Sequence, residues 1–285
     1  MTASVGTSVI TRVESGHPKE RVELLAVEEP LDIRLQYGPE DERAETRLGI
    51  SMRTPGQDQD LVLGLLHSEG IIRNRDQVRR IWHCQQTEGE ASGNVMKVSL
   101  SPEIELDPRH LDRKFAATAS CGICGQRSLE AVKAILPGKL PPIQPMIPLA
   151  LLHTLPDKLA EQQAAFRHTG GMHAAAWFDW KGNLMLLRED IGRHNALDKL
   201  IGAALQLDAL PLHQGMLLLS GRIGFELVQK ALMAGCPLVA AIGAPSSLAV
   251  SLAQAHEQCL VGFLRAHRCN IYAAPHRLSI PISPS

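Results

Sequence analysis

The stretch that decides the fold runs from Met216 to Leu264 and reads MLLLSGRIGFELVQKALMAGCPLVAAIGAPSSLAVSLAQAHEQCLVGFL. Short apolar runs alternate in it with segments of helical periodicity. The apolar runs are 216–219, 238–242 and 260–264, and the helical segments between them are 225–234 and 248–257. Strands that alternate with helices of this length are typical of βαβ units. The stretch therefore predicts a parallel sheet with helices on both faces, an α/β core.

The residues before this stretch extend the core. Residues 174–178 and 184–187 predict a hairpin around the turn Lys181-Gly182-Asn183, and residues 196–205 predict a helix. Two further helices are expected at 126–136 and 149–164. Between them, residues 137–148 contain five prolines and predict an extended linker.

The first third of the chain is strand-rich. Strands are expected at 21–27, 31–37, 46–52, 78–82 and 95–100, with one helix at 58–69 that Gly70 ends. We therefore divide the chain into a flexible N-terminus (1–20), a strand-rich module (21–112), a cysteine loop (113–125) and an α/β core (126–285), which makes the whole chain α+β.

Composition narrows the function classes. The chain has 285 residues and a formal net charge of −1, so no global field steers it to nucleic acid or to an anionic membrane. We expect neither as a partner, and any anionic ligand must be held by a local site. The opening residues lack a leader pattern and no apolar run is long enough for a membrane span. Six cysteines without a secretory signal predict free thiols in a reducing compartment, so we expect a cytoplasmic protein.

A cysteine pair stands in Ser120-Cys121-Gly122-Ile123-Cys124-Gly125, just before a predicted helix. Each thiol at this spacing can stabilise the thiolate of the other, and a helix N-terminus adds partial positive charge. A thiolate there can attack a sulfane sulfur and hold it as a persulfide. Sulfur exchange needs in-line access to the thiolate, which the flanking glycines leave open.

Other interpretations of the pair remain open. A structural zinc site needs more ligands, and no second CxxC exists. A thioredoxin-like redox site would place the pair directly after a strand of an early βαβ unit. Chance occurrence in a small-residue turn is the third possibility. The four remaining cysteines are expected to fill the core, and they are Cys84, Cys236, Cys259 and Cys269.

Polar turns follow three predicted strands. Ser220-Gly221-Arg222 and the turn 241–247 each precede a helix, so their amides and the Arg222 guanidinium can hold an anion at one edge of the sheet. The string 188–195 contains Arg193 and His194, which are hard to explain as helix caps, although a solvated helix start is the alternative. No metal pair is expected from His168 and His173. A zinc deaminase signature is absent, because no carboxylate follows His173 at the required spacing.

In family order, these motifs resemble the formate dehydrogenase accessory sulfurtransferase (FdhD) family. The resemblance covers about residues 22–272, and the Cys-Gly-Ile-Cys pair and the string Glu189–Lys199 are its most specific parts. The supporting stretches are 28–30, 68–72, 169–171, 173–176, 220–222, 244–245 and 260–263. Two positions depart from the expected pattern: Gly224 replaces a small hydroxyl residue, and Ala266-His267 replaces a pattern with glycine.

The resemblance implies a core related to the cytidine deaminase fold without its zinc, and a homodimer. It implies a sulfurtransferase of the persulfide-carrier type, with Cys121 as the carrier and Cys124 as the assisting thiol. Sulfur would come from a cysteine desulfurase and pass to the molybdenum cofactor that carries two pterin guanine dinucleotides, which formate dehydrogenase needs. That cofactor would be bound as acceptor, and no resident metal is expected.

The resemblance also implies the cofactor contacts. These are Phe263, Leu264, Arg265, Ala266, His267 and Arg268, to which we add Arg193, His194 and Arg222 as groups for the phosphates and guanine. Two alternative functions stay open. One is a cofactor-binding chaperone for formate dehydrogenase whose cysteines only order a loop. The other is a dithiol oxidoreductase with a reversible Cys121–Cys124 bond.

Overall fold

The structure is a computed structural model, and it describes residues 4–84, 94–104, 106, 136–143 and 146–280. Its centre is a six-stranded mixed sheet with the strand order β13-β12-β11-β10-β8-β9. The strands are β8 (His173–Asp179), β9 (Leu184–Asp190), β10 (Gly215–Leu219), β11 (Leu238–Ala241), β12 (Cys259–Arg265) and β13 (Arg268–Ala273). The α/β class expected from the sequence is confirmed.

The sheet is parallel only in its middle. Strands β10, β11 and β12 are parallel, whereas β8, β9 and β13 each run antiparallel to their neighbours. The parallel strands expected within 216–264 are confirmed as β10, β11 and β12, and the expected hairpin is confirmed as β8–β9. Strand β13 was not predicted, and it runs antiparallel to β12 because a short hairpin connection reverses the strand direction.

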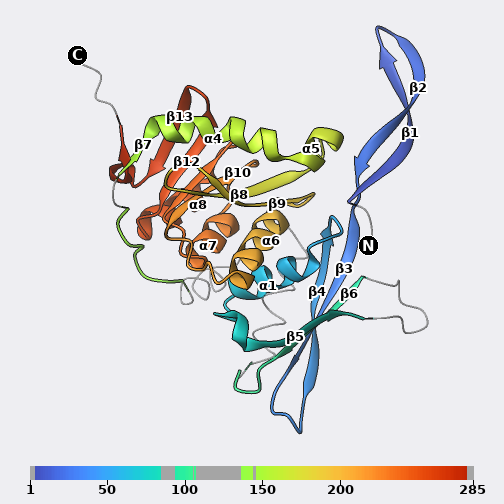
Figure 1. Cartoon of the computed structure of the whole chain (residues 1–285), viewed down its shortest axis with the longest axis vertical. Coiled ribbons are helices and arrows are strands. Elements are labelled where there is room, and N and C mark those ends of the chain that lie inside the picture. Colours follow the sequence, from blue (N-terminus) through green and yellow to red (C-terminus); the bar gives the residue numbers. More distant parts are fainter. Residues whose placement is uncertain (1–3, 85–93, 105, 107–135, 144–145, 281–285) are drawn as a thin grey trace.

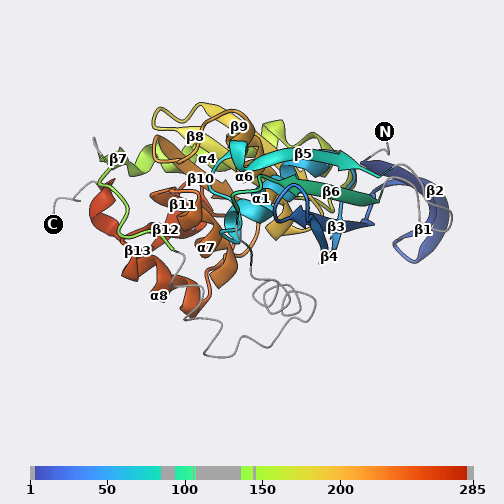
Figure 2. The same ribbon diagram turned by 90° about the horizontal axis from the view of Figure 1, so that it is seen from below.

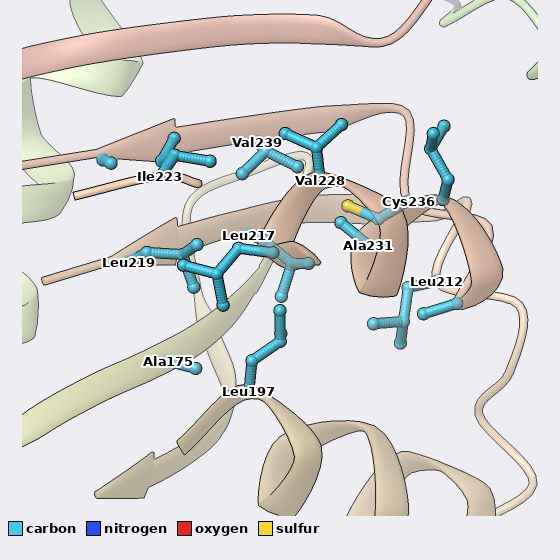
Figure 3. Packing of buried hydrophobic residues seen from close by; sticks show 14 of the residues in the cluster. Ala175, Leu197, Leu212, Leu217, Leu219, Ile223, Val228, Ala231, Cys236 and Val239 are labelled. Carbon is cyan, nitrogen blue, oxygen red and sulfur yellow. The ribbon is translucent and has the colours of Figure 1, made fainter. Parts of the chain in front are cut away.

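Helices cover both faces of this sheet, as Figure 1 shows. On one face lie α6 (Arg193–Gln206), α7 (Phe225–Met233) and α8 (Ser247–Ala255), and on the other lie α4 (Leu149–Gln162) and the short α5 (Ala164–Thr169). The β10 side chains alternate between two cores. Leu217 and Leu219 pack toward α6 and α7 (Figure 3), and Met216 and Leu218 pack on the α4 side. Burial on both faces explains why these strands are continuous apolar runs.

The strand-rich module forms a second, four-stranded sheet with the order β4-β3-β6-β5. Its elements are β3 (Glu29–Tyr37), β4 (Ala44–Arg53), α1 (Asp58–Ser68), the 3₁₀ turn Arg75–Gln77, β5 (Val78–His83) and β6 (Val95–Leu100). Leu31, Ile33 and Leu35 alternate toward the buried face under α1. The predicted strands and helix of this region are confirmed to within a few residues.

Helix α1 joins the module to the core by packing against α6. The two backbones touch at Gly64 and Gly202. A Cβ atom built on Gly64 would overlap the Asp198 carbonyl oxygen, and one on Gly202 would overlap that of Asp60. Only glycine permits an approach this close.

The N-terminus differs from expectation. The sequence predicts a flexible stretch over residues 1–20, but β1 (Val5–Glu14) and β2 (His17–Ala26) form a two-stranded hairpin. On one face of β1, Thr7 and Thr11 separate the valines at positions 5, 9 and 13, so the sequence lacks the strict apolar alternation that predicts a strand.

The remaining elements are short. A two-stranded pair joins β7 (Ile147–Pro148) to β14 (Leu278–Ser279), which follows the 3₁₀ turn Pro275–Arg277. The described part of residues 137–148 is otherwise irregular, as expected of the linker. The whole cysteine loop and all of the predicted helix 126–136 except Leu136 lie outside the described residues, and the division into parts remains a prediction. Within the described ranges, no helix is long and apolar enough to cross a membrane.

Candidate functional site

The candidate site lies at the carboxyl edge of β10, β11 and β12, where the strand-to-helix turns meet. The Gly243 amide donates to the Gly221 carbonyl at 3.1 Å, and the Ile223 amide donates to the Ala244 carbonyl at 3.0 Å. A Cβ on Gly243 would lie 2.7 Å from the amide nitrogen of Arg222. The two anion-competent turns expected from the sequence are therefore in direct backbone contact.

His173 lies beside the first of these turns, at the start of β8. The Ser220 Oγ accepts from the Ala174 amide at 2.8 Å and lies 3.4 Å from His173 Nδ1. Because this hydroxyl accepts from the amide, its own proton can point to Nδ1, which leaves the His173 Nε2–H as a donor. Burial, followed by the charge of Arg193, lowers the pKa of His173, so the ring is neutral at pH 7.

Arg193 and His194 form the first turn of α6, and His194 reaches the first turn of α7. The His194 Nε2 lies 3.2 Å from the Glu226 Oε2. Burial, followed by Arg193, Lys230 and His173, lowers the pKa of His194 to about 4. Glu226 opposes this shift weakly, because its side chain is 51% exposed and screened by water. His194 is therefore a neutral imidazole. Because its ring is largely buried, it does not fit the alternative interpretation of the string 188–195 as a solvated helix start.

Hydrogen-bond donors at the starts of α6 and α7 are not satisfied by side chains of the described residues. The Arg193 Nε is buried and has no hydrogen-bond partner among the described residues. Neither α6, capped by Gly192, nor α7, capped by Gly224, has a side-chain cap on its first amides. Uncapped helix starts and a guanidinium attract anions.

Asp190 holds the turn that precedes α6. Its Oδ1 accepts from the Gly192 amide at 2.8 Å, and its Oδ2 accepts from the Thr54 amide at 3.1 Å. The Lys199 Nζ lies 2.7 Å from the same Oδ2, and both side chains are almost fully buried. Lys199 also donates to the Thr54 carbonyl at 2.8 Å. A buried ion pair thus fixes the end of β4 and the start of α6 together.

The predicted cofactor segment 263–268 forms the β12–β13 turn. The Phe263 amide donates to the Gly243 carbonyl at 3.0 Å, and Arg265 Nη1 donates to the Ile242 carbonyl at 2.8 Å. Phe263 has a φ of 52° and is 41% exposed. The Leu264 side chain is fully buried in the α4-side core, so only the backbone of this residue could make the predicted cofactor contact, which stays a prediction.

The tip of that turn stands apart. Ala266, His267 and Arg268 are exposed. Among the described residues, no hydrogen bond or ion pair joins their side chains to Arg193, His194 or Arg222. The structure therefore brings Arg193, His194 and the turn of Arg222 together and connects them through Gly243 to Phe263, but it leaves 266–268 at the rim.

The chemistry of the edge is that of an anion site. Its donors are two neutral imidazoles, two guanidiniums and free amides, which suit phosphate oxygens. Within the described residues, no cluster of three or more His, Cys, Asp or Glu side chains could hold a metal ion. A hollow of about 610 Å³ lies elsewhere, on the open face of β3 and β4, where Asp32 already accepts from Arg34 and Arg47.

The predicted catalytic residues Cys121 and Cys124 lie outside the described residues. Of the other cysteines, Cys236 and Cys259 are buried, and burial raises the pKa of each to about 12, which confirms their role as core fillers. Cys84 and Cys269 are only half-buried, so the prediction holds less well for them.

Sequence reasoning did not name His173, Lys199 or Thr54 as parts of the site, and it included Asp190 only as a member of the string 188–195. His173 carried a usable signal, since it stands directly before a predicted strand whose neighbour ends at Ser220. Thr54 gave no such signal in the sequence, because it lies 136 residues from Asp190, the residue that it contacts.

Comparisons with known proteins agree with this architecture. A protein from Streptomyces avermitilis called sulfur carrier protein FdhD is 44% identical over 276 residues, covering 95% of this chain and 94% of the relative. One of the same name from Mycobacterium tuberculosis is 45% identical over 267 residues, covering 91% of this chain and 93% of the relative. A crystal structure from Desulfotalea psychrophila, proposed to be a formate dehydrogenase accessory protein, superposes with a TM-score of 0.73. It is 23% identical and covers 97% of this chain and 100% of its own, which shows the shared fold. The model of the FdhD/NarQ family matches residues 26–279, and the chain therefore belongs to that family.

Proposed function

We propose that this protein is a sulfur carrier that takes sulfur onto Cys121 as a persulfide and delivers it to a molybdenum cofactor bearing two guanine dinucleotides. One observation carries the proposal. Relatives called sulfur carrier protein FdhD match more than nine-tenths of the chain at 44% and 45% identity. The Cys-Gly-Ile-Cys pair lies within the matched residues.

Loading of the carrier is a thiol exchange. The Cys121 thiolate attacks the sulfane sulfur of a persulfide on a cysteine desulfurase, and the desulfurase cysteine leaves as a thiolate. The new S–S bond forms on Cys121 as the old one breaks, so no external oxidant is needed.

Delivery of that sulfur as sulfide needs two electrons. The Cys124 thiolate can supply them by attacking Cys121, because the terminal sulfur then leaves as sulfide and the two cysteines end as a disulfide. A thiol reductant restores the pair for the next cycle.

The edge of the six-stranded sheet supports an acceptor that carries phosphates. Arg193 and Arg222 offer guanidiniums, and the starts of α6 and α7 offer uncapped amides. The imidazoles of His173 and His194 are neutral and can donate without adding charge, because the pKa of each is lowered. The exposed ring of Phe263 offers a flat apolar surface for a base. We assign the guanine dinucleotide parts of the cofactor to this edge.

The partners follow from the same proposal. A cysteine desulfurase supplies the sulfur, formate dehydrogenase receives the sulfurated cofactor, and the protein works as a homodimer in the cytoplasm.

The test is the mass of the intact protein after incubation with a cysteine desulfurase and cysteine. We expect the wild type to gain one sulfur atom that a reductant removes. Cys121→Ala should gain none, while Cys236→Ala is the matched control because that thiol is buried and its pKa is raised to about 12.

A sulfur gain that persists in Cys121→Ala would overturn the assignment of the carrier. No gain in the wild type, together with an active dehydrogenase in cells that express only Cys121→Ala, would instead establish the cofactor-binding chaperone. A mass loss of two hydrogen atoms without added sulfur under mild oxidation, with turnover of a disulfide substrate, would establish the dithiol oxidoreductase.

A further inference from the structure

The turn between β12 and β13 has an unusual backbone at Phe263. From the pair Gly262 and Asn270 to the pair Arg265 and Arg268, β12 advances three residues while β13 advances two, so β12 carries a β-bulge. Phe263 lies in this bulge with a φ of 52°. Among the non-glycine residues that the structure describes with a positive φ, it is the only aromatic one. A bulky side chain is rare in this conformation, and bulges redirect side chains next to functional sites.

A strained conformation persists only where the surrounding structure fixes it. On the side of β11, the Phe263 amide donates to the Gly243 carbonyl at 3.0 Å, and the Arg265 Nη1 donates to the Ile242 carbonyl at 2.8 Å. Between these two contacts, the Leu264 side chain is fully buried in the α4-side core. The bulge is therefore held from β11 and from the core.

His153 in α4 holds the bulge from a third side. Helix α4 lies along β12 on the face of the sheet opposite α8 (Figures 1 and 2). Leu152 and Leu155 bury α4 in the same core as Leu264. The His153 Nδ1 lies 2.7 Å from the Arg265 carbonyl oxygen. Because a carbonyl oxygen only accepts, Nδ1 carries the hydrogen and donates it.

This hydrogen bond is not needed to build the core. It is exposed to solvent, and a hydrogen bond of that kind contributes little net stability. Its acceptor, however, is the carbonyl of Arg265, two residues after Phe263. The contact therefore acts on the conformation of the bulge and on the direction in which the Phe263 ring points.

We propose that His153 is a positioning residue for the guanine base: by holding the Arg265 carbonyl, it keeps the bulge in the conformation that turns the Phe263 ring outward. The ring is 41% exposed, and a base can stack on it. His153 does not touch the base and acts only through the backbone of 264–265. The inference rests on the proposed function, because guanine is the base assigned there to this edge.

The test is the affinity of the full chain for guanosine diphosphate (GDP), measured by titration calorimetry. GDP is the probe because it is the nucleotide end of the proposed acceptor. His153→Leu should weaken GDP binding by about 5- to 10-fold, because part of the stacking on Phe263 is lost. His153→Asn should bind GDP within about twofold of the wild type, because the asparagine Nδ2–H takes the place of the histidine Nδ1–H.

A double-mutant cycle tests whether His153 acts through Phe263. Phe263→Ala alone should weaken GDP binding by about 10-fold or more, because the stacking surface is removed. On that background His153→Leu should cause no further loss, since the ring that His153 positions is gone.

The matched control removes a similar contact elsewhere. The exposed His213 has its Nδ1 2.9 Å from the Pro211 carbonyl oxygen, and it precedes β10 at the opposite edge of the sheet. His213→Leu should leave GDP affinity unchanged. Circular dichroism of each variant checks that it is folded at the temperature of the titration.

Several results would overturn the inference. These are equal GDP affinities of the wild type and His153→Leu, an Asn variant as weak as the Leu variant, a further loss on the Phe263→Ala background, or a weakened His213→Leu. Loading of Cys121 by the desulfurase is measured on the same variants. Normal loading with any of these results contradicts the role of His153 alone, whereas a wild type that binds no GDP contradicts both that role and the assignment of the guanine dinucleotide to this edge.

Discussion

His194 is the residue whose charge state depends most on its surroundings in the candidate site. Its pKa of about 4 in the folded chain lies below the usual value of 6.5 because burial and the cations Arg193 and Lys230 oppose protonation. Between those two values the unfolded chain binds a proton that the folded chain does not. Stability is therefore unaffected above pH 6.5 and falls as the pH drops from 6.5 toward 4.

This depression predicts a pH-dependent effect of His194→Gln. From pH 7 to pH 5 the wild type should lose about 1 kcal/mol more unfolding free energy than the variant, after discounting for the partial exposure of the ring. Urea unfolding at the two pH values measures the difference. An imidazole of His194 whose pKa by NMR lies near the usual value would contradict the prediction.

The residue scale also shows the limit of sequence reasoning at this site. Arg193, His194 and Arg222 can be identified from the sequence because a polar string between a predicted strand and helix is unusual. The neutral state of His194 and the unpartnered Nε of Arg193 depend on burial and on the groups that lie nearby in the fold. A local sequence pattern contains neither kind of information.

At the scale of elements, the turns after β10 and β11 depend on glycine at one position and tolerate a side chain at another. A Cβ on Gly243 would meet the backbone of Arg222 and Gly221 at 2.7 Å, whereas a Cβ on Gly224 would meet nothing within 4 Å. Gly224 is the N-cap residue of α7, where serine is favoured.

Gly243→Ala should therefore lower the free energy of unfolding by about 1–3 kcal/mol, because two stretches of backbone must separate. Gly224→Ser in the adjacent turn should be neutral or stabilise by a few tenths of a kcal/mol. Chemical denaturation of both variants tests the contrast, and equal effects would show that the contact of the two turns is not tight.

Most elements were predictable because their periodicity reflects local burial. The run 216–219 and the helix 225–234 match β10 and α7 closely. The β8–β9 hairpin was predicted, but the antiparallel pairing of β8 with β10 was not, since the pairing of segments that are distant in the sequence is not present in a local pattern. The expected strand 21–27 overlaps β2, but β1 was missed because most side chains of the β1–β2 hairpin remain exposed and no buried stripe marks it.

At the scale of the whole molecule, the buried pair Asp190–Lys199 connects the strand-rich module to the core through Thr54. Removing one partner leaves a charge without compensation in the interior. Lys199→Met should therefore lower the free energy of unfolding by about 3–5 kcal/mol and destabilise both parts in one transition.

The double variant Asp190→Asn with Lys199→Met should recover most of that loss, because no buried charge is left and the amide oxygen can still accept from Gly192. Denaturation curves of the two variants, followed by both circular dichroism and fluorescence, measure this recovery. A double variant no more stable than Lys199→Met would show that the charge itself is not the cause.

The glycine-to-backbone contact of α1 and α6 constrains how relatives of this protein can exchange parts. With Gly64 and Gly202 in contact with the opposite backbone, the two helices share one surface on which neither can gain even a methyl group. Consider a recombinant chimera that takes residues 21–112 from one relative and the rest from another. Its α1–α6 contact is preserved only when the first parent has glycine at the position of Gly64 and the second has glycine at the position of Gly202. Whether two parents can be combined in such a chimera thus depends on glycine at both positions, Gly64 and Gly202, and not only on the linker between the two parts.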